Sequence, residues 1–168
     1  MRLISRAALV AAASIPLAAV APALASAATA SDVTYAYTVN GSTVTNTIVN
    51  NSGTPLTCAT SLAPAPGGVL PPVEDVLQNG QSLGASGEIQ PGTVTQTVTD
   101  IPDGSYVVLA SCGRYDTDPA MWVSAYPGVE EYLKQFPVTA FTVQQESTVV
   151  TVPHTNPAGP DLGAIFGS

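Results

Sequence analysis

Apolar and polar residues alternate with a period of two along several short segments of this chain. The first such segment has two valines and two tyrosines on one side: Val33, Tyr35, Tyr37 and Val39. Because successive side chains of a β-strand point to opposite faces, this pattern predicts a strand with one buried face. Asn40 and Gly41 follow, and both tolerate a positive φ. The sequence therefore predicts a tight hairpin turn at this dipeptide.

Six more segments carry the same signature, and turn residues separate most of them. They lie around 44–48 and at 54–62, 92–99, 105–112, 138–145 and 147–152. The sequence thus predicts a mostly β protein of about seven strands. We expect an antiparallel immunoglobulin-like sandwich with Greek-key connections, because a parallel sheet would need long helices between its strands. The turn from Ile101 to Gly104, which leads into Tyr106, is a device of many immunoglobulin-like secreted domains and supports this fold by analogy.

Two short helices are expected in loops between strands. Residues 126–136 place Pro127 in the first turn, acidic residues early, Lys134 late and Pro137 as a stop. Apolar residues in that segment recur at the spacing of one helix face. A second candidate covers residues 72–79. Residues 63–72 and 83–92 are rich in Pro, Gly and Ser, so the sequence predicts loops there.

The first thirty residues have the pattern of a secretory signal peptide. Arg2 and Arg6 precede an uncharged run rich in Ala, Leu and Val, and small residues then alternate up to Ala30. We expect cleavage after Ala27 or Ala30; the alternative is an uncleaved membrane anchor, because the apolar run approaches the length of a bilayer span. Residues 31–152 are then one domain, and residues 153–168 are a flexible Pro/Gly-rich tail. No later segment is apolar for long enough to cross a membrane, so the processed protein is expected to work outside the cytoplasm.

The charge balance excludes one class of partner. The chain has four Lys and Arg against twelve Asp and Glu. Loss of the signal peptide would leave only Arg114 and Lys134 against the twelve carboxylates, a formal charge of −10. Nucleic acids and anionic membrane surfaces are bound by clusters of Lys and Arg, which this acidic chain lacks. We expect no nucleic-acid partner.

The chain has two cysteines, Cys58 and Cys112, and both fall on apolar faces of predicted strands. In an oxidising compartment an even pair is expected to form a disulfide. We expect this bond to lie buried between the two packed sheets. Two free buried thiols are the alternative.

Few residues suggest catalysis or metal binding. His154 is the one histidine, and it follows the last predicted strand, which is a poor place for the base of a catalytic triad. Asp116 and Asp118 alternate in a loop and could supply oxygen ligands to Ca²⁺, although such pairs are common in ordinary turns. Glu130 and Glu131 are adjacent and would point to different faces of a helix. Apart from this possible Ca²⁺, no cofactor is expected.

Aromatic side chains gather between residues 115 and 136 and form the best candidate binding surface: Tyr115, Trp122, Tyr126 and Tyr132. Exposed aromatics beside carboxylates suit stacking on sugars or anchoring a protein partner, whereas the alternative is packing onto the core. The sequence therefore favours a secreted or envelope-associated, non-catalytic domain that binds a protein or a polysaccharide. The alternatives are a small secreted hydrolase that uses carboxylates and a structural envelope component stabilised by calcium.

Overall fold

The computed structural model describes residues 27–79, 82–116, 118–146 and 149–152, and it is mostly β. One sheet has three antiparallel strands in the order β1 (Val33–Asn40), β2 (Thr43–Asn50) and β5 (Gly92–Val98). The other sheet has six strands. Their path is β4 (Leu83–Ile89), β3 (Leu56–Pro64), β6 (Gly104–Arg114), β7 (Ala120–Ala125) and β8 (Thr139–Glu146), and β9 (Val149–Val152) pairs with the start of β6.

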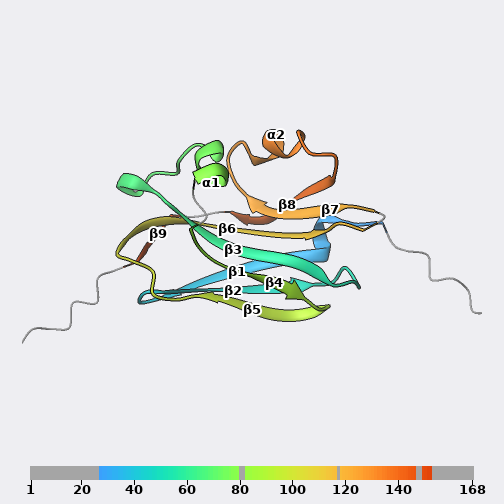
Figure 1. The fold of residues 1–168 in the computed structure, drawn as a ribbon, viewed down its shortest axis with the longest axis horizontal. Coiled ribbons are helices and arrows are strands. Elements are labelled where there is room, and N and C mark those ends of the chain that lie inside the picture. The colour runs from blue at the N-terminus through green and yellow to red at the C-terminus, as the bar shows by residue number, and fades with distance from the viewer. Residues whose placement is uncertain (1–26, 80–81, 117, 147–148, 153–168) are drawn as a thin grey trace, which may run out of the picture.

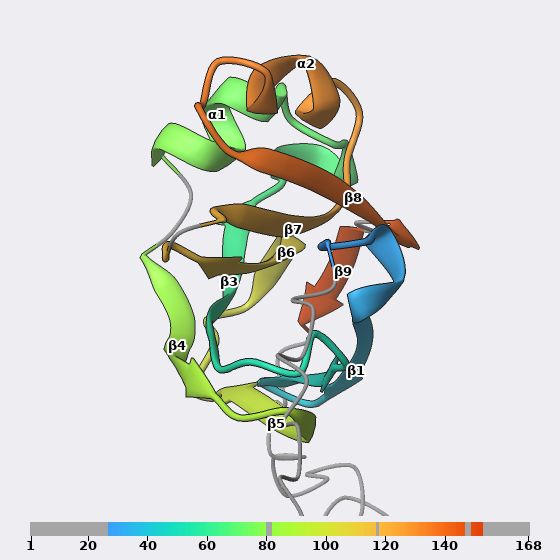
Figure 2. The ribbon, with the colours of Figure 1, turned by 90° about the vertical axis from the view of Figure 1, so that its right-hand side faces the viewer.

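The elements form three layers (Figures 1 and 2). The three-stranded sheet lies below the six-stranded sheet, and the helices α1 (Val73–Asn79) and α2 (Val129–Leu133) lie above it. Two short 3-10 helices, η1 (Ala30–Asp32) and η2 (Pro66–Gly68), complete the fold. Among the described residues, no helix is long and apolar enough to span a membrane.

The core between the sheets comes from the alternating faces that the sequence predicts. Val33 and Tyr35 of β1 and Ile48 of β2 pack against residues of β3, β6 and β7, including the fully buried Trp122. On β3, Leu56, Cys58, Thr60 and Leu62 are all buried, as the period-two pattern predicts. Burial of such side chains stabilises the fold by roughly 25 cal/mol for each Å² of apolar surface removed from water.

The central strands of the six-stranded sheet are buried on both faces. The upper face of this sheet carries Ala63 of β3, Val107 and Leu109 of β6 and Val123 of β7, which pack against α1 and α2. β6 is therefore buried along almost its whole length. This double burial explains why the sequence of β6 is a nearly continuous apolar run rather than a strict alternation.

Cys58 and Cys112 form a disulfide, which confirms the predicted pairing. The bond is buried in the core between the sheets, as predicted, but it joins two strands of one sheet rather than linking the two sheets. The two residues lie directly opposite each other on the neighbouring strands β3 and β6 of one sheet, with their Cα atoms 4.0 Å apart. Directly opposite residues of antiparallel strands come close enough for such a bond. Parity along each strand placed both cysteines on the inner face, but it does not say which sheet each strand joins.

Several other predicted elements need correction. β4 lies where the Gly/Ser-rich composition predicted a loop, and β7 lies in a segment for which the sequence predicted no strand. β7 and β8 run parallel, so the sheet is mixed rather than wholly antiparallel. The first hairpin turns at Gly41 and Ser42, one residue later than predicted, and Gly41 has the positive φ of 56°. The predicted signal peptide, apart from residues 27–30, and the predicted tail lie outside the described residues.

α2 is shorter than the predicted helix over 126–136 and has five residues. Gly128, which precedes it, has a φ of 81°, a left-handed conformation that cannot continue a helix. The helix therefore begins after this glycine rather than at Pro127.

A buried polar chain crosses the core between the sheets. Asn46 Nδ2 donates to Thr60 Oγ1 at 2.8 Å, and Thr60 Oγ1 donates to Gln96 Oε1 at 2.8 Å. Gln96 Nε2 then donates to the carbonyl oxygen of Cys58 at 3.0 Å. The three side chains come from β2, β3 and β5, so they join both sheets and favour one alignment of the two.

Replacing Thr60 with Val is expected to lower the free energy of unfolding by about 1–3 kcal/mol, because at nearly constant shape it removes the acceptor of Asn46 Nδ2 and the donor to Gln96 Oε1. Denaturant unfolding measures the change. The control is Thr57→Val on the same strand, where Thr57 is exposed. Equal stability of the two variants would contradict a stabilising role for the polar chain.

Candidate functional site

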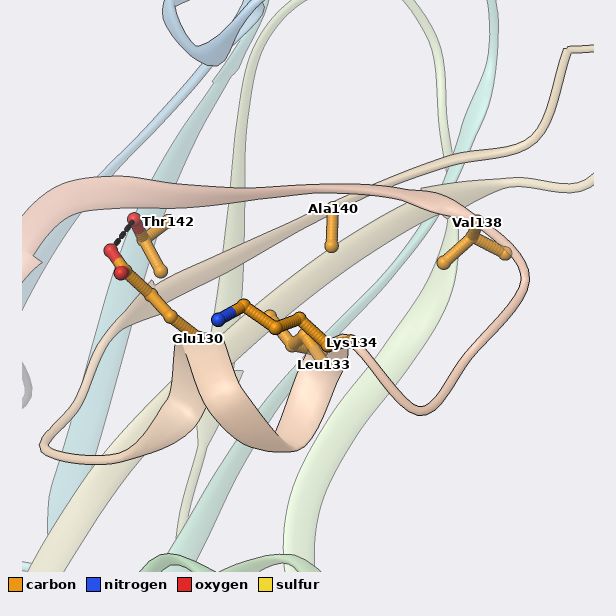
Figure 3. Close-up of a pocket in the computed structure, with 6 residues that line it drawn as sticks. All are labelled: Glu130, Leu133, Lys134, Val138, Ala140 and Thr142. Carbon is orange, nitrogen blue, oxygen red and sulfur yellow. Dashed lines mark hydrogen bonds between the residues drawn. The ribbon is translucent and has the colours of Figure 1, made fainter.

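A groove lies between α2 and β8 and consists of two adjoining hollows of about 300 and 310 Å³. Both are lined by Glu130 and Lys134 of the α2 segment and by Thr142 of β8. We call this feature the α2–β8 groove. Figure 3 shows β8 along one side and the helix along the other, with Ala140 pointing from the strand toward the helix and Val138 at the end of the loop that leads into the strand. The loop between α2 and β8 closes one end.

The polar groups of the groove carry opposite charges. Thr142 Oγ1 donates to Glu130 Oε1 at 3.1 Å (Figure 3), and Lys134 Nζ donates to Glu131 Oε2 at 2.6 Å. The hydrogen bond to the Glu131 carboxylate, followed by its charge, raises the pKa of Lys134. Lys134 and Glu131 are mostly exposed, so their ion pair contributes little to stability. Glu130 forms no salt bridge within the part of the chain that the structure describes, which leaves the groove with an excess negative charge.

The floor of the groove is apolar. Leu133 comes from α2, and Val138 and Ala140 come from the loop and the strand that follow it. Alternate residues of β8 face the groove, while Phe141 and Val143 point to the opposite side and pack against the core between the sheets. The period of the strand thus places one small apolar and one hydroxyl side chain, Ala140 and Thr142, at the groove.

β8 is the last strand of its sheet, and no described strand pairs with its outer side. The amide of Thr139 donates to the carbonyl oxygen of Pro119, on the side of β7. Because backbone groups of successive residues point to alternate sides of a strand, those of Ala140 and Thr142 point away from β7. Residues 139–145 contain no charge and no proline, the features that usually protect such a strand.

The structure does not bring the four predicted aromatic residues together on one surface. Trp122 is fully buried between the sheets and stacks on Phe141, with ring centroids 5.7 Å apart. Tyr126 is buried beneath the helices, where its hydroxyl donates to the carbonyl oxygen of Pro71. Tyr132 is half-buried and packs on Phe136. Only Tyr115, with 65% exposure, is open to solvent.

Asp116 and Asp118 lie beside a base. Arg114 Nη2 donates to Asp118 Oδ2 at 2.5 Å, and Arg114 Nε lies 3.9 Å from Asp116 Oδ1. The amide of Asp118 also donates to Asp116 Oδ1 at 3.2 Å, as in an ordinary Asx turn. A guanidinium at this position competes electrostatically with a cation. In the ranges that the structure describes, no three His, Cys, Asp or Glu side chains lie close enough to hold a metal ion.

The carboxylates named as candidates do not line one pocket. Glu130 and Glu131 line the α2–β8 groove, whereas Asp116 and Asp118 belong to the loop after β6. His154 lies outside the described residues. Two tyrosines of the core have shifted titration: burial raises the pKa of Tyr37 to about 12, and burial raises the pKa of Tyr35 well above its usual value. Both groups are therefore neutral at physiological pH and act in packing rather than as bases.

The surface predicted from the sequence stays a prediction, and the side chains that line the α2–β8 groove are different ones. The sequence did not single out Ala140 and Thr142, because a small or polar residue on an alternating strand has the pattern of an ordinary solvent-facing position. It did not single out Val138, which lies just before β8. No protein-family model matches the chain, and neither does any curated protein or solved structure.

Proposed function

We propose that this protein is an exported, non-catalytic, immunoglobulin-like β-sandwich domain that binds a protein or a polysaccharide in the α2–β8 groove. The strand order supports the fold assignment. β1, β2 and β5 lie on one side and β3, β6 and β9 on the other, which corresponds to strands A, B, E and C, F, G of immunoglobulin-like domains. Tyr106 near the start of β6 donates to the carbonyl oxygen of Pro102 at 2.9 Å, as in a tyrosine corner.

Export is supported by the pattern of the first thirty residues and is compatible with the disulfide. A non-catalytic role is supported by the separation of the carboxylates. A hydrolase of this kind needs two carboxyl groups that flank the scissile bond. Glu130 accepts a hydrogen bond from Thr142 and Glu131 accepts one from Lys134, and both carboxylates are exposed on a short helix.

The observation that carries the binding function is the position of the groove beside the unpaired side of β8. An extended polypeptide that pairs with such a strand satisfies its free backbone groups, and pockets beside the strand then select its side chains. A sugar-binding groove usually offers an exposed aromatic face. The one aromatic residue that lines this groove, Tyr126, is only 6% exposed. A protein partner is therefore favoured over a polysaccharide, and the excess negative charge favours a basic residue in that partner.

The test is a binding screen of the domain against short extended peptides of either charge and against soluble polysaccharides. A ligand that binds only the native state raises the melting temperature by mass action, by the equivalent of about 2.7 kcal/mol at one hundred times its Kd. We expect a shift with peptides that carry a basic residue. A shift with a glycan alone would identify a polysaccharide as the ligand. No shift with any probe would overturn the binding function proposed for this groove.

Ala140→Arg is expected to lower the affinity for the selected ligand at least tenfold, because the side chain at this position points into the groove. Stability should change little, because Ala140 is exposed. Isothermal titration measures the affinity. Ala36→Arg is the matched control, since Ala36 is an exposed alanine on β1 of the other sheet. Glu130→Gln keeps the hydrogen bond from Thr142 and removes the charge, so it isolates the electrostatic contribution. Unchanged affinity in Ala140→Arg would place the ligand elsewhere.

A further inference from the structure

The residues just before β1 cover the opening between the two sheets. Ala28 packs against the core between the sheets, and η1 lies beside β8, the end strand of the upper sheet. Figure 2 shows this blue segment next to β8 and above β1. Next to it is a hollow of about 400 Å³ whose lining includes Val33, Tyr35 and Val143. Residues 28–32 thus lie where the two sheets are open to solvent.

Specific hydrogen bonds hold this segment in place. The carbonyl oxygen of Thr29 accepts from Nε1 of the fully buried Trp122 at 2.7 Å. The Thr29 amide and hydroxyl donate to the two carboxylate oxygens of Asp32 at 2.8 and 2.7 Å. The carbonyl oxygen of Asp32 accepts from the amide of Asn51 at 2.7 Å, which joins the segment to the end of β2. Thr29 therefore satisfies a buried donor and caps η1.

Two cleavage sites are open to a signal peptidase that accepts small residues at the first and third positions before the cut. For a cut after Ala27 these two positions are Ala27 and Ala25, and for a cut after Ala30 they are Ala30 and Ala28. The second cut would remove Thr29, so that the indole N–H of Trp122 loses its acceptor and Asp32 loses its partner. It would also remove Ala28 from the edge of the core.

We propose that the chain is cut between Ala27 and Ala28, and that residues 28–32 of the processed protein seal the opening between the sheets. Water adds across this one peptide bond, which leaves a carboxylate on Ala27 and an amino group on Ala28. The processed protein keeps every residue whose contacts hold the segment, because Ala28, Thr29 and Asp32 all follow the cut. The proposal needs export but no ligand, so it is independent of the α2–β8 groove.

The first test is the intact mass and N-terminal sequence of the protein recovered from the medium of a secreting host that expresses the full chain. We expect an N-terminus at Ala28. An N-terminus at Ser31, or an uncut chain, overturns the assigned site. Ala27→Arg is expected to abolish this cut, because the pocket admits only a small residue there. Ala30→Arg is the matched control, and it should leave the N-terminus at Ala28 because Ala30 is exposed.

The second test measures the sealing role of residues 28–32 independently of the cleavage site. Proteins that start at Ala28 and at Ser31 are made directly, and their melting temperatures are compared. The shorter protein is expected to melt about 5 °C lower or more, because it lacks the acceptor for a buried donor. Thr29→Ala, which keeps the carbonyl oxygen but loses the hydroxyl, should lie between the two. Equal melting temperatures for the two starts overturn the sealing role, whatever the cut site.

Discussion

Replacing both cysteines with alanine is expected to lower the free energy of unfolding by roughly 4 kcal/mol, which corresponds to a fall in melting temperature of about 10 °C or more. Cys58 and Cys112 are 54 residues apart in sequence and join β3 to β6. The bond mainly restricts the unfolded chain, and in the chain-entropy model its effect grows with the length of the loop that it closes. Both residues are fully buried, so the loss of sulfur from the core adds to the change.

Denaturant unfolding of the oxidised protein, the reduced protein and the double variant separates these two contributions. The reduced wild type loses the bond but keeps both sulfur atoms. Thr57→Ala is the control, because Thr57 is the exposed neighbour of Cys58 on the same strand and should change stability by no more than about 0.5 kcal/mol. An unchanged midpoint for the reduced protein would show that the bond contributes nothing to stability.

Trp122→Ala is expected to lower the free energy of unfolding by about 3–5 kcal/mol, the usual range for removal of a large aromatic side chain from a core. Trp122 has no exposed surface, stacks on Phe141 and lies directly opposite Cys112 in the sheet. Its removal would leave a cavity between the sheets next to the disulfide. Circular dichroism in urea measures the loss, because Trp122 is the single tryptophan and its variants lack that fluorescence signal.

Two further variants keep this prediction testable if the alanine variant does not fold. Trp122→Phe retains a ring but loses the donor to Thr29, so we expect a smaller loss of about 1 kcal/mol or more. Tyr115→Ala is the exposed aromatic control and should stay within about 0.5 kcal/mol of the wild type. A Trp122→Ala variant as stable as Tyr115→Ala would contradict the burial of the indole and restore a surface role for it.

The sequence predicted the strands that alternate strictly, and it did so for a physical reason. In β1, β2 and β5, and in the first half of β3, one face meets the core and the other is more exposed, so period-two patterning marks both the strand and its buried side. The pattern did not predict β4, because Gly84 and Gly87 give this strand the composition of a loop. Gly84 lies against the backbone of β3, where an added Cβ would approach the carbonyl oxygen of Thr60 to 3.0 Å. In the sequence, a glycine that allows two strands to approach closely cannot be distinguished from a glycine in a turn.

The sequence predicted a binding surface between residues 115 and 136, and this stays a prediction. The α2–β8 groove overlaps that segment at α2. Trp122 is in the core because β7, which carries it, is an internal strand, whereas Tyr115 stays exposed. Burial of a tryptophan depends on which strands flank its own, and local patterning contains no information about those neighbours.

By itself the sequence determined the acidic charge, the pairing of the two cysteines, the mostly β class and the inward faces of most strands. Each of these depends on residue type or on neighbours along the chain. The tertiary structure alone decided that the disulfide lies within one sheet, that β8 runs parallel to β7 with no other described strand on its outer side, and that Thr29 meets Trp122. These features join residues far apart in the chain. They depend on the order of strands in the sheets, which hydrophobic periodicity does not encode.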